Sequence, residues 1–301
     1  MLRIGLFLLT NLAVIAAASF TLKLLGVEHY LHGSELNLTR LLIFCAIFGF
    51  AGSLISLFIS LFISKWMAKR STGVKIITNA GTPDERWLVE TTRSLSDTAG
   101  IGMPEVGIFP APESNAFATG WNRDNALVAV SKGLLQRFTR DEVRAVLAHE
   151  IGHVANGDMI TLSLIQGIVN TFVMFFARII GHTVDKVIFK NERGHGIGFY
   201  IATFVAEMIL GVLASIIVMK FSRYRENRAD VAGATLADRN SMINALKRLS
   251  SEQKAKMPSS MPDTMTAFDI SSGFSKRNLG KLFASHPPLE DRIRALQQQM
   301  T

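Results

Sequence analysis

Residues 148–153 read Ala-His-Glu-Ile-Gly-His and contain the pattern H-E-x-x-H, which on a helix supplies two zinc ligands and a general base. His149 and His153 are four residues apart, so on a helix both emerge from one face, about one turn apart. That spacing lets both imidazoles reach one tetrahedral zinc ion. Glu150 points to the same side and is predicted to accept a proton from a zinc-bound water. These six residues therefore predict a catalytic metal site.

The residues on either side of this motif favour a helix. Thr139 begins the capping-box pattern Thr-Arg-Asp-Glu, in which Glu142 is the third following residue. Apolar residues then recur at helical spacing, and Asn156-Gly157 predicts the end of the helix. The alternative interpretation is a surface helix with two unrelated histidines. Because only seven histidines occur in 301 residues, a chance match is rare and the metal interpretation is favoured.

The composition indicates a membrane protein. Hydrophobic residues make up 49% of the chain and charged residues only 19%, and the two kinds are strongly segregated. The net charge of +8 could suggest nucleic acid, but the basic residues cluster beside apolar runs, where positive-inside anchoring explains them. We therefore expect a lipid bilayer as a partner, and no nucleic acid. The single cysteine, Cys45, lies inside an apolar run, which excludes a disulfide framework and predicts a packing residue.

Residues 1–64 are predicted to form a transmembrane hairpin. Residues 4–25 and 41–63 are apolar runs that are long enough to cross a bilayer. A cleaved signal peptide is the alternative for the first run, but its apolar part is too long and lacks a clear cleavage site. Basic residues follow residue 64 at once, so the positive-inside rule places the next segment in the cytoplasm and the loop 26–37 outside.

A second pair of apolar runs of spanning length, Met159–Ile180 and Phe199–Met219, accounts for most of residues 159–220. These runs carry the polar residues Asn170, Arg178 and Glu207. Polar side chains are costly at membrane depth, so the runs either span the bilayer or pack partly as buried helices against the catalytic part. His182 and His195 fall in the intervening loop without a partner at metal-ligand spacing, and both are expected to be solvated.

Residues 65–158 are predicted to form the first part of a cytoplasmic metalloprotease domain. A helix over 84–99 and three short strands precede the H-E-x-x-H helix; the strands are expected at 103–109, 115–120 and 126–131. In zinc proteases of this general plan, an edge strand can receive the substrate by β-augmentation. Asn115 is therefore a candidate for holding the substrate backbone. Phe117 and Trp121 are interpreted as ordinary core and turn residues.

A catalytic zinc needs a third protein ligand and an open position for water. Just beyond the fourth apolar run, Glu226 is the best candidate, and Asp230 is placed to orient a ligand histidine through its other ring nitrogen. The alternative is a basic juxtamembrane helix whose acids balance its arginines. One zinc can join both parts of the chain only if the intervening runs cross the membrane an even number of times. The basic residues at 220–228 also place this end inside.

The C-terminal part, residues 221–301, is predicted to complete the metalloprotease domain. Residues 241–250 continue a helix, and Ser251–Ser275 has few large apolar residues and is interpreted as a mobile loop. Ser285-His286-Pro287-Pro288 then opens a final amphipathic helix. His286 has two interpretations. It caps that helix, or it approaches the zinc site as a transition-state contact or an occupant of the open position.

Several separate motifs occur in a fixed order, and together they resemble the HtpX family of bacterial membrane zinc metalloproteases, which are related to the CAAX prenyl proteases. The motifs are N-A-F-A-T-G at 115–120, H-E-I-G-H at 149–153, R-x-R-E-x-x-A-D at 223–230 and S-H-P-P at 285–288. The resemblance implies one zinc ion on His149, His153 and Glu226, with Glu150 as the base. It also implies a multi-pass protein of the bacterial inner membrane, active toward misfolded or damaged membrane proteins under stress.

The expected fold is a mainly α membrane protein with an N-terminal transmembrane hairpin. An α+β zincin-like metalloprotease domain follows, interrupted by the second apolar helix pair. The expected activity is zinc-dependent endopeptidase cleavage of proteins. Two other classes stay open: a membrane-anchored scaffold or binding protein with a structural zinc, for which His286 would be the spare ligand, and a transporter. The transporter is disfavoured because the metal motif lies outside the apolar runs.

Overall fold

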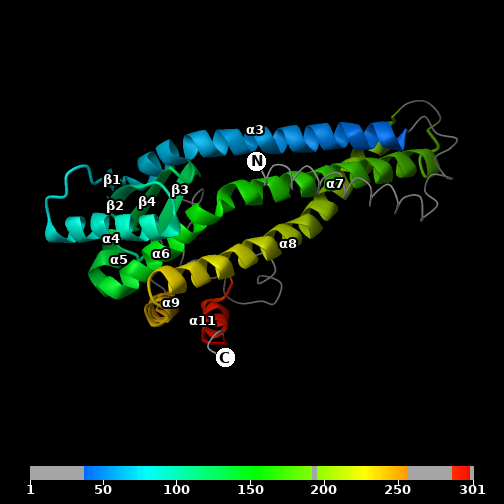
Figure 1. Ribbon diagram of the computed structural model, residues 1–301. Helices are drawn as coiled ribbons and strands as arrows, with labels where there is room; N and C mark the ends of the chain where they lie inside the picture. Colours follow the sequence, from blue (N-terminus) through cyan, green and yellow to red (C-terminus); the bar gives the residue numbers. More distant parts are fainter. Residues whose placement is uncertain (1–36, 192–194, 256–286, 299–301) are drawn as a thin grey trace. The chain divides into compact units, whose positions relative to one another are not determined.

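The computed structural model describes residues 37–191, 195–255 and 287–298 (Figure 1). These residues form a mainly helical chain with one small sheet, which agrees with the predicted fold class. The predicted span 4–25 and His286 lie outside the described residues. The elements are α3 (Leu38–Thr72), β1 (Lys75–Ile76), α4 (Pro83–Ala99), β2 (Glu105–Phe109), β3 (Ala116–Asn122), β4 (Asn125–Ser131), α5 (Lys132–Arg137), α6 (Arg140–Asn156), α7 (Asp158–Val187), α8 (Ile197–Leu236), α9 (Arg239–Lys254) and α11 (Leu289–Gln298).

The chain divides into two compact units. One comprises Met1–Ser56 and Ser163–Ser215, and the other comprises Leu57–Leu162 and Ile216–Thr301. The first unit therefore contains most of the apolar helices, and the second contains the sheet and the H-E-x-x-H helix. The predicted division into four parts, residues 1–64, 65–158, 159–220 and 221–301, stays a prediction.

Helices α7 and α8 are long and apolar enough to cross a membrane, and the part of α7 after Leu162 and the part of α8 before Ile216 lie in the first unit. Each has a window of high mean hydropathy, within Ile160–Val187 and Ile197–Leu236 respectively. Only 29% and 17% of the residues in their most apolar windows are buried, whereas the core helix of a soluble protein would be mostly buried. Cys45 is fully buried beside Leu42, Phe175 and Ile179, so its predicted role as a packing residue is confirmed.

The prediction that His182 is a solvated loop residue is wrong. Helix α7 continues to Val187, and His182 on it is only 4% exposed. Gly181 does not end the helix. It allows α7 to pack closely against α8, since a Cβ there would collide with the hydroxyl of Thr203 on α8. The connection between the helices is thus shorter than expected. His195 lies in it and is exposed, with its ring centroid 6.2 Å from that of His182.

The sheet of the second unit has the strand order β1-β2-β4-β3 (Figure 1). β2 and β4 are parallel, and the other two pairs are antiparallel. The three predicted strands are therefore present as β2, β3 and β4, and β3 lies at an edge. Asn115 directly precedes β3.

Apolar side chains cover both faces of the sheet, with the period of two expected for strands. Val106, Val128 and Ala118 belong to the main core together with residues of α4, α6, α9 and α11. Phe109, Phe117 and Leu127 pack on the other face with Ala68 of α3. Phe117 is accordingly a core residue, as predicted.

Helix α6 has the boundaries that the sequence predicts. The Thr139 side chain accepts a hydrogen bond from the Glu142 backbone N–H, and the Glu142 carboxylate accepts one from the Thr139 N–H. Gly157 ends the helix in the left-handed conformation, with φ of 64°. Both ends of the motif-bearing helix are thus defined locally.

Candidate metal centre

Helix α6 presents His149, Glu150 and His153 from one side. His149 and Glu150 are buried, at 2% and 5% exposed, and His153 is partly exposed. The two imidazole ring centroids are 4.8 Å apart and the rings are nearly perpendicular. The helical spacing therefore brings both rings together, as a shared metal requires.

Helix α8 brings Glu226 to these histidines. His149 Nε2 lies 3.7 Å from Glu226 Oε2, and His153 Nε2 lies 3.3 Å from Glu226 Oε1. One ligand atom from each residue lies within 4.8 Å of the other two. Two donors at about 2.1 Å from one tetrahedral ion would be about 3.4 Å apart, so the geometry and the donor types fit zinc.

Small residues allow α8 to approach α6 this closely. A Cβ on Gly152 of α6 would lie 2.6 Å from the Cβ of Ala232. On α8, a Cβ at Gly233 would lie 3.4 Å from the backbone nitrogen of His149 and 3.3 Å from the Ala145 carbonyl oxygen. The distance from Glu226 to the histidines therefore depends on the absence of side chains along this contact.

We expect Gly152→Ala to weaken zinc binding by about tenfold or more and to destabilise the protein by about 1–3 kcal/mol. The added methyl group would force α8 away from α6 and carry Glu226 with it. Zinc competition and denaturant unfolding measure the two effects. Gly211→Ala is the matched control because a Cβ at this position of α8 meets nothing within 4 Å. Parent-like zinc affinity in Gly152→Ala would contradict this account of the helix contact.

Each histidine also lies against a carboxylate on its Nδ1 side. His149 Nδ1 is 3.0 Å from Asp230 Oδ1, and His153 Nδ1 is 2.8 Å from Asp158 Oδ2. Such partners orient the ring and leave Nε2 as the nitrogen that would bind a metal. Asp230 was predicted from the sequence as a partner of a histidine, whereas Asp158 was not. The feature of the sequence that could have indicated Asp158 is an acidic residue directly after the helix-ending glycine, five residues beyond His153.

Arg292 of α11 is a second residue near the centre that was not predicted from the sequence. It is completely buried and binds Asp230 through two nitrogens, with Nε 2.8 Å from Oδ2. Its Nη1 also lies 3.9 Å from Glu226 Oε2. Burial alone would raise the pKa of Asp230, but the charge and hydrogen bonds of Arg292 hold it below its usual value. The feature of the sequence that could have indicated its burial is its position on the apolar face of α11, between Leu289 and Leu296.

Glu150 is tied to the edge strand. Its carboxylate accepts a hydrogen bond from the backbone N–H of Ala118 in β3. Burial raises the pKa of Glu150, and the nearby histidines oppose this. A carboxyl whose pKa lies closer to neutrality is a better general base at physiological pH than an ordinary surface glutamate.

Asn115 lies at the start of the same edge strand. Its carbonyl oxygen accepts a hydrogen bond from Ser131 of β4, so alternate residues of β3 turn their backbone groups outward. The Asn115 side-chain oxygen accepts the backbone N–H of Ala116 at 2.8 Å. Asn115, Ala116 and Ala118 therefore lie along the strand edge to which the Glu150 carboxylate is bonded.

His153 differs electrostatically from an ordinary histidine. Burial lowers its pKa, but the charge of Glu226 and the hydrogen bond to Asp158 outweigh burial and raise the pKa to about 10. A ligand imidazole must be deprotonated at the metal-binding nitrogen, so a metal bound here at neutral pH would displace a proton from His153.

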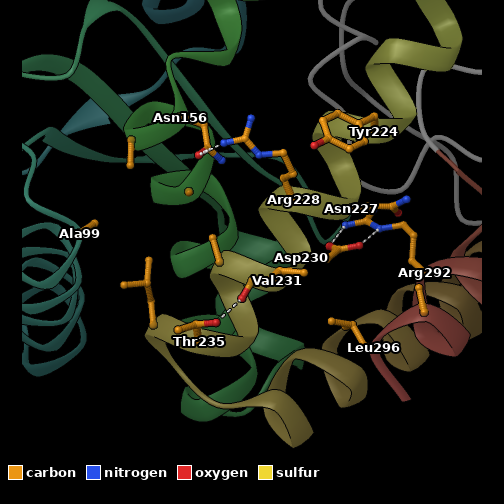
Figure 2. Close-up of a pocket in the computed structure, with 15 residues that line it drawn as sticks. Ala99, Asn156, Tyr224, Asn227, Arg228, Asp230, Val231, Thr235, Arg292 and Leu296 are labelled. Carbon is orange, nitrogen blue, oxygen red and sulfur yellow. Dashed lines mark hydrogen bonds and ion pairs between the residues drawn. The ribbon is translucent and has the colours of Figure 1, made fainter. Parts of the chain in front are cut away.

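A cavity of about 610 Å³ lies beside the centre, lined by residues of α4, α6, α8 and α11 (Figure 2). Asp230 and Arg292 form part of its wall, and Arg228 donates to Asn156 at 2.8 Å. Figure 2 shows the dashed contacts of both pairs. The two histidines, Glu150 and Glu226 are not among its lining residues, so this cavity adjoins the centre without containing it.

Comparison with known proteins gives one consistent family. Residues 83–300 match Peptidase family M48. The chain is 68% identical over 296 residues to "Protease HtpX" of Cellvibrio japonicus, covering 98% of both chains. It is 65% identical over 301 residues to "Protease HtpX" of Pseudomonas putida strain GB-1, covering 99% of this chain and 100% of the relative.

A solved structure shares the fold. The "Crystal Structure of S. mikatae Ste24p" aligns with 98% of this chain and 67% of its own, with a TM-score of 0.60 and 17% identity. The resemblance to the HtpX family stated from the motifs is therefore confirmed by sequence, and the overall fold by structure.

Proposed function

The chain belongs to peptidase family M48 and is a membrane metalloprotease, and we propose that it cleaves proteins with zinc held by His149, His153 and Glu226. Glu150 is the general base in this proposal. The observation that carries it is the convergence of the three ligand atoms from α6 and α8 beside a buried glutamate. This set has three protein ligands from histidine and carboxylate, as in catalytic zinc sites, and leaves a position for water.

When bound, zinc would polarise the scissile carbonyl group and increase the acidity of the attacking water. Glu150 accepts the proton of that water and delivers it to the leaving amine. The Ala118 N–H holds the Glu150 carboxylate in place, so the base is positioned before substrate arrives. Asp230 and Asp158 keep the two imidazole rings oriented.

The substrate backbone pairs with β3 in this proposal. β3 is an edge strand of the described sheet, and it carries both Asn115 and the amide bound to Glu150. An extended peptide added to this edge would run past the metal ligands of α6. Such pairing requires an unfolded segment, which supports misfolded or damaged proteins, including membrane proteins, as substrates in stress-related quality control.

We place the catalytic unit in the cytoplasm, at the bacterial inner membrane. Basic residues follow α3's apolar part and recur at 220–228 of α8, which supports this orientation. The test uses Cys45→Ser with Arg123→Cys in the exposed β3–β4 turn. A membrane-impermeant maleimide should label it in inverted vesicles and not in intact spheroplasts. Labelling in intact spheroplasts but not in inverted vesicles would show that the catalytic unit has the opposite orientation.

The proposed activity is tested by metal reconstitution. Detergent-purified protein is stripped of metal, and zinc or magnesium is added back with one model protein, offered either native or reduced and unfolded. We expect cleavage of the unfolded form with zinc and none with magnesium, because imidazole ligands favour zinc. Failure to cleave while one zinc is bound per chain would contradict the protease assignment of this site. Equal cleavage of both forms would contradict the preference for unfolded substrates.

A further inference from the structure

The two carboxylate–histidine pairs of the metal centre are not equivalent. Asp230, beside His149, is bound through both oxygens by the buried Arg292. Asp158, beside His153, is 3% exposed and has a different environment. Within residues 37–191, 195–255 and 287–298, no lysine or arginine forms an ion pair with its carboxylate. The charge of Asp230 is therefore shared with a cation, whereas that of Asp158 is directed at the imidazole.

The backbone and the side chain of Asp158 have different partners, and the carboxylate contacts His153. Arg225 approaches it but donates from Nη1 to the Asp158 carbonyl oxygen, at 3.2 Å. Asp158 is also the first residue of α7, and the N-terminus of a helix favours a negative charge. The Asp158 side chain therefore lies at a helix start that suits an acidic residue, and it contacts His153.

We propose that Asp158 is a positioning residue that strengthens His153 as a metal ligand, while Asp230 serves mainly to orient His149. A carboxylate on Nδ1–H increases the electron density available at Nε2 and so strengthens the bond to the metal. Asp230 does this less, because Arg292 withdraws part of its charge. This inference rests on the proposed ligand set of His149, His153 and Glu226.

Neutral replacements separate charge from orientation. Asp158→Asn keeps the size and an oxygen that accepts the His153 Nδ1–H, and asparagine is tolerated at a helix start. Asp230→Asn alone would leave Arg292 buried without its partner, which is strongly destabilising. The matched change is therefore Asp230→Asn with Arg292→Gln, which removes both charges together. Asp141→Asn changes an exposed acid at the start of α6 and serves as the control.

The experiment measures zinc affinity by competition with a chromophoric chelator, using the full-length protein in detergent. All variants carry Glu150→Gln, so that no proteolysis occurs during the titration. We expect Asp158→Asn to weaken zinc binding by about 10- to 100-fold. The Asp230→Asn/Arg292→Gln pair should lose less than Asp158→Asn does, because the amide oxygen still accepts the His149 Nδ1–H, and Asp141→Asn should equal the parent. Asp158→Ser, which also starts helices well, should lose at least as much as Asp158→Asn and replaces it if that variant does not fold.

Cobalt substitution gives a second readout. The visible spectrum of bound cobalt should shift in Asp158→Asn and stay close to the parent in the double variant, because the ligand strength of only one imidazole changes. Parent-like zinc affinity in folded Asp158→Asn would overturn the inference, and so would a larger loss in the double variant. Absence of zinc binding in the parent would instead overturn the proposed ligand set.

Discussion

Glu150→Gln is expected to bind zinc as the parent does and to cleave about 10²- to 10⁴-fold more slowly. Glutamine keeps an oxygen for the Ala118 N–H and adds no bulk, so the ligands of α6 and α8 stay in place. It cannot accept the proton of the attacking water. Cleavage of an unfolded protein and zinc content per chain are measured on the same preparation.

Glu90→Gln is the matched control, since this glutamate is exposed on α4 and away from the centre. It should cleave at the parent rate. A Glu150→Gln variant that keeps its zinc and also cleaves at the parent rate would rule out Glu150 as the base. Loss of zinc together with activity would mean that Glu150 supports the metal site rather than the proton transfer.

Glu226→Ala is expected to lose zinc by more than about 100-fold in affinity, because it removes a direct ligand rather than a residue that orients one. Cleavage should disappear with the metal. The variant should still fold, since Arg292 keeps both of its hydrogen bonds to Asp230. Zinc affinity is measured by chelator competition, and folding by thermal unfolding in the metal-free state.

Glu90→Ala controls for the loss of a glutamate as such. If Glu226→Ala bound zinc as tightly as the parent, another residue would complete the ligand set. In the scaffold interpretation, that residue would be His286.

The local features of the centre were predictable because short-range patterns define them. The capping box at Thr139, the stop at Gly157 and the four-residue spacing of the histidines all lie within one helix. The strands were predictable as short apolar runs bounded by turn residues. Both of their faces are buried, one against α6 and the other against α3. Glu226 could be proposed from the sequence for a different reason. Its arginine-rich surroundings contain few acids, and the metal motif required an acidic ligand.

The partners of the proposed ligands were harder to predict because they depend on tertiary packing. Arg292 is 62 residues from Asp230, and in sequence it resembles any arginine of an amphipathic helix. Only its place on the apolar face of α11 marks it. Asp158 looks like the polar start of an apolar run, and its contact with His153 depends on the turn at Gly157.

The wrong prediction for His182 has a related cause. Gly181 was interpreted as the first residue of a loop, because the apolar run ends at Ile180. In the structure it lets α7 and α8 pack closely, and α7 continues past it. A single sequence does not distinguish a glycine that ends a helix from one that accommodates a neighbouring helix.

The measurement that tests the central claim most directly is zinc K-edge X-ray absorption of the reconstituted full-length protein. We expect two histidine nitrogens and carboxylate or water oxygens at about 2.0–2.2 Å. Glu226→Ala, loaded with excess zinc, should keep both imidazoles, with water in place of the carboxylate. A shell with three or more imidazoles in the parent would contradict the account, because it would identify a closed structural site in place of a catalytic one.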